Sequence, residues 1–289
     1  MCQVTQIRQE FVKMCLYPKE FYVNDKARLL YTDTEGKPVY MTKKVTVACG
    51  KCVECLRKRS EEWSFRIMDE CSVWKDNCFV TLTYNDENLP LNGTLVKADL
   101  QKFLKRLRRA VEPAKIRFFA CGEYGSKGMR PHYHVIVFNW CPSDMKFFKT
   151  DKSGCELFRS ATIEKLWTFG FSSVGKVTLQ SAKYCSKYMQ KLNTLRVGCI
   201  PSYTVMSNRP GIGYWKIDCA DLSDDKLYRD GKSIHLPRYY LKVLEREGHD
   251  LTEFIERRCT VGKMREDPEL LAQRRKKAKE FCKNLLTKA

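Results

Sequence analysis

Residues 131–139 (PHYHVIVFN) place two of the chain's four histidines in a run that is typical of a β-strand. Side chains of a strand alternate between its two faces, so His132 and His134 are expected on the same face, two residues apart. Residues 116–125 (IRFFACGEYG) form a second strand-like run upstream, and a glycine-containing basic turn at residues 126–131 joins the two. A hairpin that presents both imidazoles on one side is therefore predicted.

Regular hydrophobic patterns lie on both sides of this hairpin. They predict helices at 60–74, 95–111, 161–169 and 181–192, the last capped by Ser181, and strands at 79–84 and 171–179. With the hairpin included, the order from residue 79 to residue 179 is β-α-β-β-α-β. This order favours an α+β fold whose central antiparallel sheet is of the split βαβ (ferredoxin-like or RRM-like) type, with flanking helices on one face.

Lysine and arginine outnumber aspartate and glutamate by 53 to 34, which gives a formal net charge of +19. So large a positive charge favours a polyanionic partner, because each neutralised phosphate releases counterions. A hydrophobic content of 43% is sufficient for a folded core. The sequence shows no apolar segment of signal-peptide or membrane-spanning length, and its 15 cysteines are an odd number. We therefore expect reduced thiols in a cytoplasm and no membrane partner.

The sheet region has a flank on each side, and the sequence accordingly suggests three parts. Residues 1–58 form an N-terminal segment with a cysteine cluster, residues 59–195 hold the sheet, and residues 196–289 form a basic C-terminal extension. A helix is predicted from Pro268 onward, and it carries a near-continuous basic run at 274–279. This run is either a solvated helix face or a surface that follows DNA.

A divalent-metal site is predicted on the hairpin. Glu123 lies nine residues before His132, and antiparallel pairing of the two strands would bring its carboxylate to the face that carries both imidazoles. Two imidazoles and one carboxylate suit Mn²⁺, Zn²⁺ or Fe²⁺, and also Mg²⁺ where water and substrate oxygens complete the shell. Two histidines at this spacing also occur as ordinary core or surface residues, but the nearby carboxylate favours the metal site.

A pair of tyrosines follows on the predicted helix at 181–192. Tyr184 and Tyr188 are four residues apart and share one face, with Lys187 beside them. A tyrosine hydroxyl can attack a phosphodiester and keep the bond energy in a phosphotyrosine. An aromatic pair at this spacing is otherwise a common core feature. Its position after the last predicted strand, downstream of the metal motif, favours the nucleophilic role.

Together these motifs resemble those of the HUH endonucleases that initiate rolling-circle replication. The matching residues are FVTLTY at 79–84, GEYG at 122–125, PHYH at 131–134 and Tyr184-x-x-Lys187-Tyr188. The chain looks most like the replication initiation proteins of small single-stranded DNA bacteriophages of the gokushovirus (Microviridae) type. The cysteine cluster, RPGIG at 209–213 and LPRYY at 236–240 are also similar to that group, so the likeness covers most of the chain.

The resemblance implies a role for each motif. Tyr184 would nick the origin, leaving a 5′-phosphotyrosine and a 3′-OH primer, and Lys187 corresponds to the lysine of the YxxK pattern. Tyr188 would be the second nucleophile of two-tyrosine relatives, whereas YxxK also fits single-tyrosine ones. The implied partners are single-stranded origin DNA and, because the sequence has no nucleotide-binding loop, a host helicase and polymerase in the bacterial cytoplasm. The implied ligands of a catalytic Mg²⁺ or Mn²⁺ are Glu123, His132 and His134.

The same residues leave other functions open. A non-catalytic protein that binds single-stranded nucleic acid would use the basic charge, with structural histidines and packed tyrosines. A transposase or relaxase would share the nicking chemistry. A two-histidine, one-carboxylate oxygenase is disfavoured, because that class places its carboxylate two residues from the first histidine and its second histidine far downstream.

Basic residues on the 95–111 helix and beside the metal motif are expected to contact DNA. That helix has one apolar stripe and therefore turns its basic residues outward. Tyr124 and Tyr133 are candidates for stacking on an unpaired base, with packing inside the sheet as the alternative for Tyr124. The expected DNA-contacting residues are Lys102, Lys105, Arg106, Arg109, Lys127 and Arg130.

The N-terminal cysteines form a second candidate metal site. Cys49, Cys52 and Cys55 offer three closely spaced thiolates, which Cys15 could complete as a structural Zn²⁺ site. An iron–sulfur cluster with a distant fourth cysteine is one alternative, and reduced thiols in a turn before a helix are the other. The close spacing of three cysteines favours a bound metal.

Overall fold

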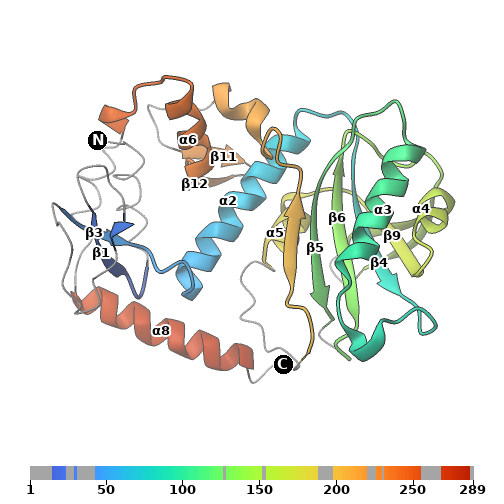
Figure 1. Ribbon diagram of the computed structural model, residues 1–289, viewed down its shortest axis with the longest axis horizontal. Helices are drawn as coiled ribbons and strands as arrows, with labels where there is room; N and C mark the ends of the chain where they lie inside the picture. The colour runs from blue at the N-terminus through green and yellow to red at the C-terminus, as the bar shows by residue number, and fades with distance from the viewer. Residues whose placement is uncertain are drawn as a thin grey trace. The chain divides into compact units, whose positions relative to one another are not determined.

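The chain separates into two compact units, which are described one at a time. Unit 1 comprises residues 1–59, 220–228 and 232–289, and unit 2 comprises residues 60–219 and 229–231 (Figure 1). The two flanks of the sheet thus belong to one unit, and residues 196–219 belong with the sheet, which differs from the three parts suggested by the sequence. The computed structural model describes residues 15–23, 29–30, 43–125, 128–151, 154–187, 198–219, 226–229, 231–254 and 268–286.

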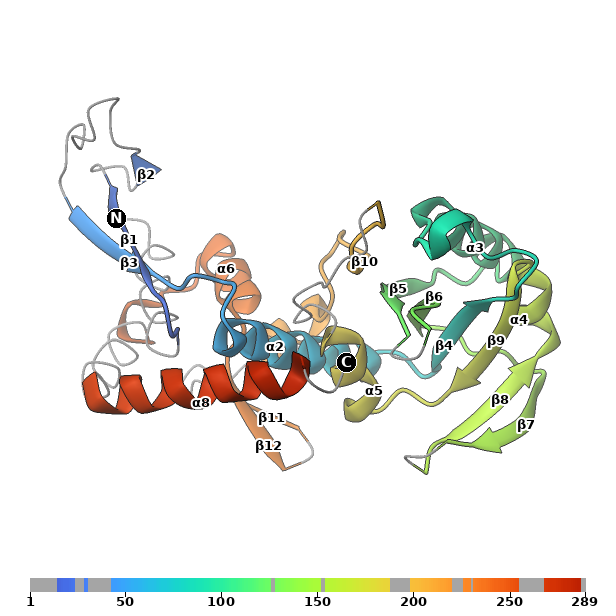
Figure 2. The same ribbon diagram turned by 90° about the horizontal axis from the view of Figure 1, so that it is seen from below.

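Unit 2 is built on a seven-stranded sheet in which neighbouring strands are antiparallel. The strand order is β10-β5-β6-β4-β9-β8-β7 (Figure 2). The prediction of an α+β protein with a central antiparallel sheet is confirmed. The strands are β4 (Asn77–Tyr84), β5 (Arg117–Tyr124), β6 (Pro131–Phe138), β7 (Met145–Thr150), β8 (Glu156–Ser160), β9 (Gly170–Gly175) and β10 (Tyr203–Met206).

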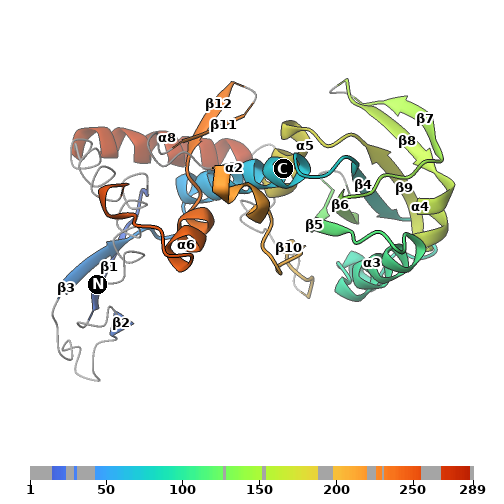
Figure 3. The ribbon, with the colours of Figure 1, turned by 90° about the horizontal axis from the view of Figure 1, so that it is seen from above.

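Helices cover both faces of this sheet. On one face lie α3 (Lys97–Ala110) and α4 (Ala161–Leu166), and on the other lie α5 (Leu179–Lys187) and the unit 2 part of α2 (Val53–Cys71) (Figure 3). The expectation of helices on one face only is wrong. The reason lies in the end of β6, where the run Val135–Phe138 is buried on both faces and therefore needs a cover on each side.

Each face has its own apolar core. On the α3 face, the predicted stripe of this helix is confirmed, because its four apolar residues are buried against the even-numbered residues of β4. On the other face, Ile67 of α2 packs with Ala182 and Cys185 of α5 over Phe119 and Ile136 of the sheet. Helix α5 is thereby fixed to the sheet. The α3 stripe consists of Leu100, Phe103, Leu104 and Leu107.

The structure differs from the predicted elements at two places in unit 2. A hairpin of β7 and β8 lies between β6 and α4, where no strand was expected, because every residue of β7 is exposed and the run lacks apolar alternation. Helix α5 begins at Leu179, and its cap is Thr178 rather than Ser181. The Ser181 amide donates to Thr178 Oγ1 at 3.1 Å, and the Thr178 amide donates to Ser181 Oγ at 2.8 Å. This reciprocal pair is a capping box with Ser181 inside the first turn.

Tyr133, which lies between the two histidines, points to the α3 face and is fully buried. Its hydroxyl donates to the Val96 carbonyl at 2.9 Å, accepts from the Val96 amide at 2.9 Å and contacts Tyr84 Oη at 2.8 Å. Burial raises the pKa of Tyr133, so the phenol stays protonated and can donate. The strand that carries the histidines is thus tied to the start of α3.

Removal of this hydroxyl tests the tie. Tyr133→Phe is expected to lower the free energy of unfolding by about 1–3 kcal/mol, because both backbone groups of Val96 lose a partner in a buried place. Urea unfolding of the purified protein measures the change. Tyr203→Phe is the matched control, since its buried hydroxyl has no hydrogen-bond partner within the part of the chain that the structure describes. Equal stabilities of the two variants would contradict the prediction.

Unit 1 contains the remaining elements. Its three-stranded antiparallel sheet has the order β2-β1-β3, and a two-stranded β11–β12 ribbon and two helices follow. None of the helices that the structure describes, in either unit, has the length and apolar character to cross a membrane. The elements are β1 (Lys19–Val23), β2 (Leu29–Leu30), β3 (Lys43–Val47), β11 (Lys226–Arg229), β12 (Lys232–His235), α6 (Arg238–Arg246) and α8 (Pro268–Leu286).

Candidate metal and tyrosine site

The β5–β6 hairpin brings together the three side chains that the sequence suggested as metal ligands. In its register, Glu123 lies directly opposite His132, and His134 follows on the same face. His132 Nε2 is 2.7 Å and His134 Nε2 is 2.8 Å from the same carboxylate oxygen, Glu123 Oε1. One ligand atom from each residue lies within 4.8 Å of the other two. This is a donor set of two nitrogens and one oxygen that converges on one point.

Both imidazoles are held through their other nitrogen. His132 Nδ1 lies 3.1 Å from the Arg130 carbonyl, which can only accept, so Nδ1 carries the proton. His134 Nδ1 lies 3.0 Å from Thr81 Oγ1 on β4, and the ring stacks on Phe79 at 5.3 Å between centroids. Partners of this kind fix the ring orientation of metal-binding histidines. Both Nε2 atoms are therefore aimed at Glu123.

Glu123 is buried and carries negative charge. Burial alone would raise its pKa, but the hydrogen bonds from His132 and His134, with their positive charge, lower the pKa of Glu123 to about 2. His134 is also buried, whereas His132 keeps partial contact with solvent. The site is therefore an ionised carboxylate in a largely buried setting, with its open side next to His132.

Tyr184 of α5 reaches the same oxygen atom. Its hydroxyl donates to Glu123 Oε1 at 3.1 Å, and its ring lies edge-on to His134 with centroids 5.0 Å apart. The helix is positioned by the Thr178 cap and by a hydrogen bond of 2.9 Å between Ser186 Oγ and Ser60 Oγ of α2. Tyr184 is nevertheless 43% exposed. A phenol that is open to solvent thus lies beside the metal-ligand cluster.

Two members of the tyrosine motif are not placed by the structure. Lys187 is the last residue of α5, and its side chain lies outside the described part. Tyr188 lies outside the described residues altogether, as does Lys127 of the hairpin turn. The roles suggested for these three residues stay predictions.

The basic residues of α3 lie on the face of the sheet opposite to Glu123. Lys105 and Arg109 are exposed, and Lys102 is exposed with its amine 3.6 Å from Asp99. Arg106 is partly buried, because its Nε donates to the Leu166 carbonyl at 2.8 Å. DNA that touches this helix would therefore not touch the candidate site from the same face.

Arg130 and the two tyrosines expected to stack on bases have structural contacts instead. Arg130 donates to the Tyr84 carbonyl at 2.9 Å and pairs with Asp86, so it holds the loop that follows β4. Tyr124 is buried on the α3 face, where its hydroxyl donates to the Ile200 carbonyl at 2.6 Å. Tyr133 is fully buried, as described above. Stacking on DNA by Tyr124 or Tyr133 is therefore a wrong prediction, because neither ring is accessible.

The sheet register reveals an aromatic residue that the sequence motifs did not indicate. Phe171 of β9 is paired with Thr83 of β4, which is paired in turn with His132. Cross-strand partners share a face, so Phe171 lies on the face of the metal-ligand cluster, two strands or about 10 Å from His132. Its side chain is 57% exposed. Strand order was the missing signal, because the sequence does not show that β9 lies next to β4.

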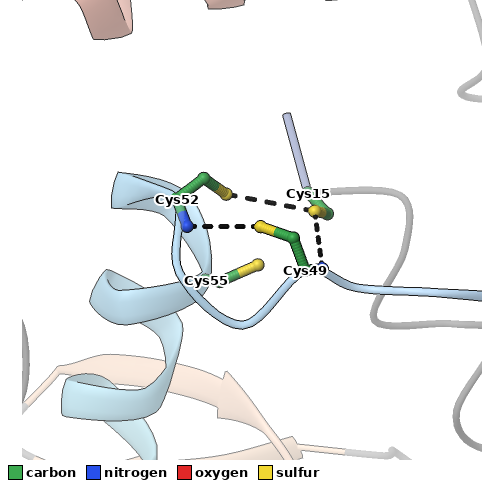
Figure 4. Close-up of side chains that lie close together, drawn as sticks. All are labelled: Cys15, Cys49, Cys52 and Cys55. Atoms are coloured by element: carbon green, nitrogen blue, oxygen red, sulfur yellow. Dashed lines mark hydrogen bonds between the residues drawn. The ribbon is translucent and has the colours of Figure 1, made fainter. Parts of the chain in front are cut away.

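The four predicted cysteines also come together, in unit 1. Cys15, Cys49, Cys52 and Cys55 have their sulfur atoms within 4.8 Å of one another (Figure 4). None of them forms a disulfide. This cluster is a second candidate metal site, distinct from the hairpin of unit 2.

Comparison with known proteins gives the family. A family model described as replication-associated protein ORF2 matches residues 77–193, which include every residue of the hairpin site and Tyr184. Replication-associated protein ORF2 of Spiroplasma virus 4 is 34% identical over 225 residues, which cover 71% of this chain and 69% of that protein. The chain therefore belongs to the replication-associated protein ORF2 family.

Two further relatives agree with this assignment. Replication-associated protein VP4 of Bdellovibrio phage phiMH2K is 35% identical over 170 residues, or 54% of each chain. Replication-associated protein ORF4 of Chlamydia phage 1 is 30% identical over 227 residues, or 71% of this chain and 55% of that protein. The matched region thus spans only about half the length of these two relatives. No solved structure matches the chain.

Proposed function

We propose that this protein is a metal-dependent endonuclease and ligase that nicks one DNA strand at a viral replication origin and so starts rolling-circle replication. The observation that carries the proposal is the convergence of Tyr184 Oη, at 3.1 Å, and both histidine Nε2 atoms on one oxygen of Glu123. A nucleophile and an electrophilic centre on one spot are what a phosphodiester transfer requires. Family membership supports a role in replication initiation.

The hairpin residues fit a divalent cation. Both Nε2 atoms and the carboxylate oxygen converge, and each imidazole is oriented by a hydrogen bond at Nδ1. Two nitrogens and one oxygen leave positions for phosphate oxygens and water, as expected for Mn²⁺ or Mg²⁺. When bound, the ion would polarise the scissile phosphate and stabilise negative charge on its oxygens.

The tyrosine would carry the covalent step. Tyr184 Oη would attack the phosphorus and lose its proton, the bond from phosphorus to the 3′ oxygen would break, and that oxygen would take up a proton. The products are a 5′-phosphotyrosine and a free 3′-OH that can prime synthesis. Attack by a 3′-OH on the phosphotyrosine reverses the step and rejoins the strand, because no bond energy is lost to water. Tyr188 is proposed as the second nucleophile, and Lys187 as a cation near the phosphate.

We place the single strand on the site face of β9 and β4. Exposed Phe171 lies in the same cross-strand row as His132 and offers a surface on which a base can stack. The net charge of +19 supplies the long-range attraction for phosphate. Helicase and polymerase are proposed to come from the bacterial host, in whose cytoplasm the reaction would take place.

Phe171→Ala is expected to weaken binding of a single-stranded oligonucleotide by about 5- to 100-fold, since one stacked base contributes roughly 1–3 kcal/mol. Fluorescence anisotropy at constant salt measures the dissociation constant. Phe147→Ala is the matched control. Phe147 is 61% exposed, but its pairing with Phe158, and of Phe158 with Val174, places it on the α3 face. Equal losses in both variants would show that Phe171 has no special place on the DNA path.

Nicking itself is tested with single-stranded oligonucleotides that tile the genome that encodes this protein. Each is labelled at one end and incubated with the full chain and Mn²⁺ or Mg²⁺. The expected result is cleavage of one tile, a 3′-OH on one product and a covalent adduct on the other, with the modified tyrosine identified by mass spectrometry. The proposal fails if no tile is cut with either metal. It fails equally if cutting leaves no adduct, because the mechanism would then not involve tyrosine.

A further inference from the structure

The cysteine cluster of unit 1 takes no part in the proposed nicking reaction, and its four residues come from separate segments. Cys15 precedes β1, Cys49 follows β3, and Cys52 and Cys55 lie at the start of α2 (Figure 4). The close-up shows the four sulfur atoms pointing toward one another from these segments. Thirty-seven residues separate Cys15 from Cys52, whose sulfur atoms are 4.0 Å apart.

The spacing of the sulfur atoms matches one ion rather than a cluster or a disulfide. A tetrahedral zinc ion with sulfur ligands at about 2.3 Å holds each pair of sulfurs about 3.8 Å apart. The observed separations of 4.0 Å for one pair and at most 4.8 Å for all are within about an ångström of that value. Disulfide sulfurs would be about 2.05 Å apart. An iron–sulfur cluster distributes its thiolates over several irons and therefore holds them farther apart.

The loop between Cys49 and Cys52 is shaped to carry charged sulfur. The amides of Lys51 and Cys52 donate to Cys49 Sγ at 3.4 and 3.2 Å, and the amide of Cys49 donates to Cys15 Sγ at 3.1 Å. Gly50 allows this turn, because its φ of +70° is a conformation that residues with a side chain rarely adopt. Backbone N–H groups that point at sulfur favour the thiolate form, which is the metal ligand.

We propose that Cys15, Cys49, Cys52 and Cys55 bind one Zn²⁺, and that this site fastens the N-terminal segment to the start of α2. All four coordination positions are filled by protein sulfur, as in structural sites, and none is left for a substrate. The residues after Cys15 are held in turn by α8. Arg275 Nε donates to the Leu16 carbonyl at 2.8 Å, and its guanidinium lies 5.5 Å from the Tyr17 ring centroid. The ion thus stabilises a unit assembled from both ends of the chain.

The zinc content of the full chain tests the proposal, measured by mass spectrometry of the metal after purification under reducing conditions. His132→Ala/His134→Ala protein is used throughout, so that the hairpin of unit 2 contributes no zinc. The expected value is about one zinc per chain, falling close to zero with Cys52→Ser. Cys155→Ser is the matched control, because Cys155 is an exposed free thiol of unit 2 and its loss should leave the zinc unchanged.

A spectroscopic measurement avoids dependence on how well the cysteine variants fold. Co²⁺ exchanged into the protein with intact cysteines is expected to show thiolate-to-cobalt charge transfer and the intense visible bands of a tetrahedral site. Removal of the metal with a chelator should speed amide exchange at residues 15–17 and 49–55 by at least about tenfold and leave β4 to β6 unchanged. Iron in place of zinc, or neither zinc in the purified protein nor a cobalt spectrum, would overturn the proposal.

Discussion

Replacement of Tyr184 by phenylalanine is expected to slow cleavage of single-stranded DNA by at least about 1000-fold, which corresponds to roughly 4 kcal/mol of lost transition-state stabilisation. The ring can still pack edge-on to His134, but the oxygen that lies 3.1 Å from Glu123 Oε1 is gone. No covalent adduct should form at this position. The rate is measured by denaturing gel electrophoresis under single-turnover conditions, and the adduct by mass spectrometry of the digested complex.

Two further variants make this result specific. Tyr228→Phe removes the hydroxyl of another exposed tyrosine, on β11, and should cleave at the unchanged rate. Tyr188→Phe separates one-tyrosine from two-tyrosine mechanisms. If it blocks only the rejoining of strands, Tyr188 is the second nucleophile, and if it changes nothing, Tyr184 acts alone. Full activity of Tyr184→Phe with an adduct mapped to Tyr188 would show that the first nucleophile is misassigned.

The candidate site was predictable from the sequence because its decisive contacts are local. A strand period of two put His132 and His134 on one face, and a short turn left the antiparallel hairpin as the simplest pairing for Glu123. The observed register, with Glu123 opposite His132, follows from these two facts. Tyr184 is a longer step, since its approach to Glu123 depends on how α5 packs over β5. That packing depends on Cys185 and Ala182, which as residue types are common in any core.

The features that the sequence did not predict depend on contacts between distant segments. Strand β10 joins the sheet next to β5 through residues that follow α5, and no periodic pattern in Tyr203–Met206 indicates this partner. The second helical layer depends on which faces of β6 are buried, and a short apolar run such as Val135–Phe138 does not reveal the number of its covers. Phe171 became visible as a site residue only through the order of β9, β4 and β6. Sequence periodicity determines faces, whereas strand order determines neighbours.

Loss of the hairpin ligands is the other change with a large expected effect. His132→Ala, His134→Ala and Glu123→Gln should each reduce metal-dependent cleavage by at least about 1000-fold, because each removes one of three converging donor atoms. Binding of single-stranded DNA should change by less than about threefold, since phosphate contacts and base stacking supply that affinity. Cleavage rates and anisotropy titrations, each at several Mn²⁺ concentrations, measure the two effects separately.

The chain provides its own controls for this prediction. His235 and His249 are the other two of its four histidines, and both are exposed and lie in unit 1. Their replacement by alanine should leave cleavage unchanged. Thr81→Val tests orientation rather than ligation, because it removes the partner of His134 Nδ1 while all three donor atoms remain. It should raise the Mn²⁺ concentration needed for half-maximal cleavage by about 10- to 100-fold, with most of the activity restored at saturation. If alanine at both His132 and His134 left cleavage intact, the ion would have to bind elsewhere. The convergence of three side chains on one carboxylate oxygen would then serve only to hold β5, β6 and α5 together.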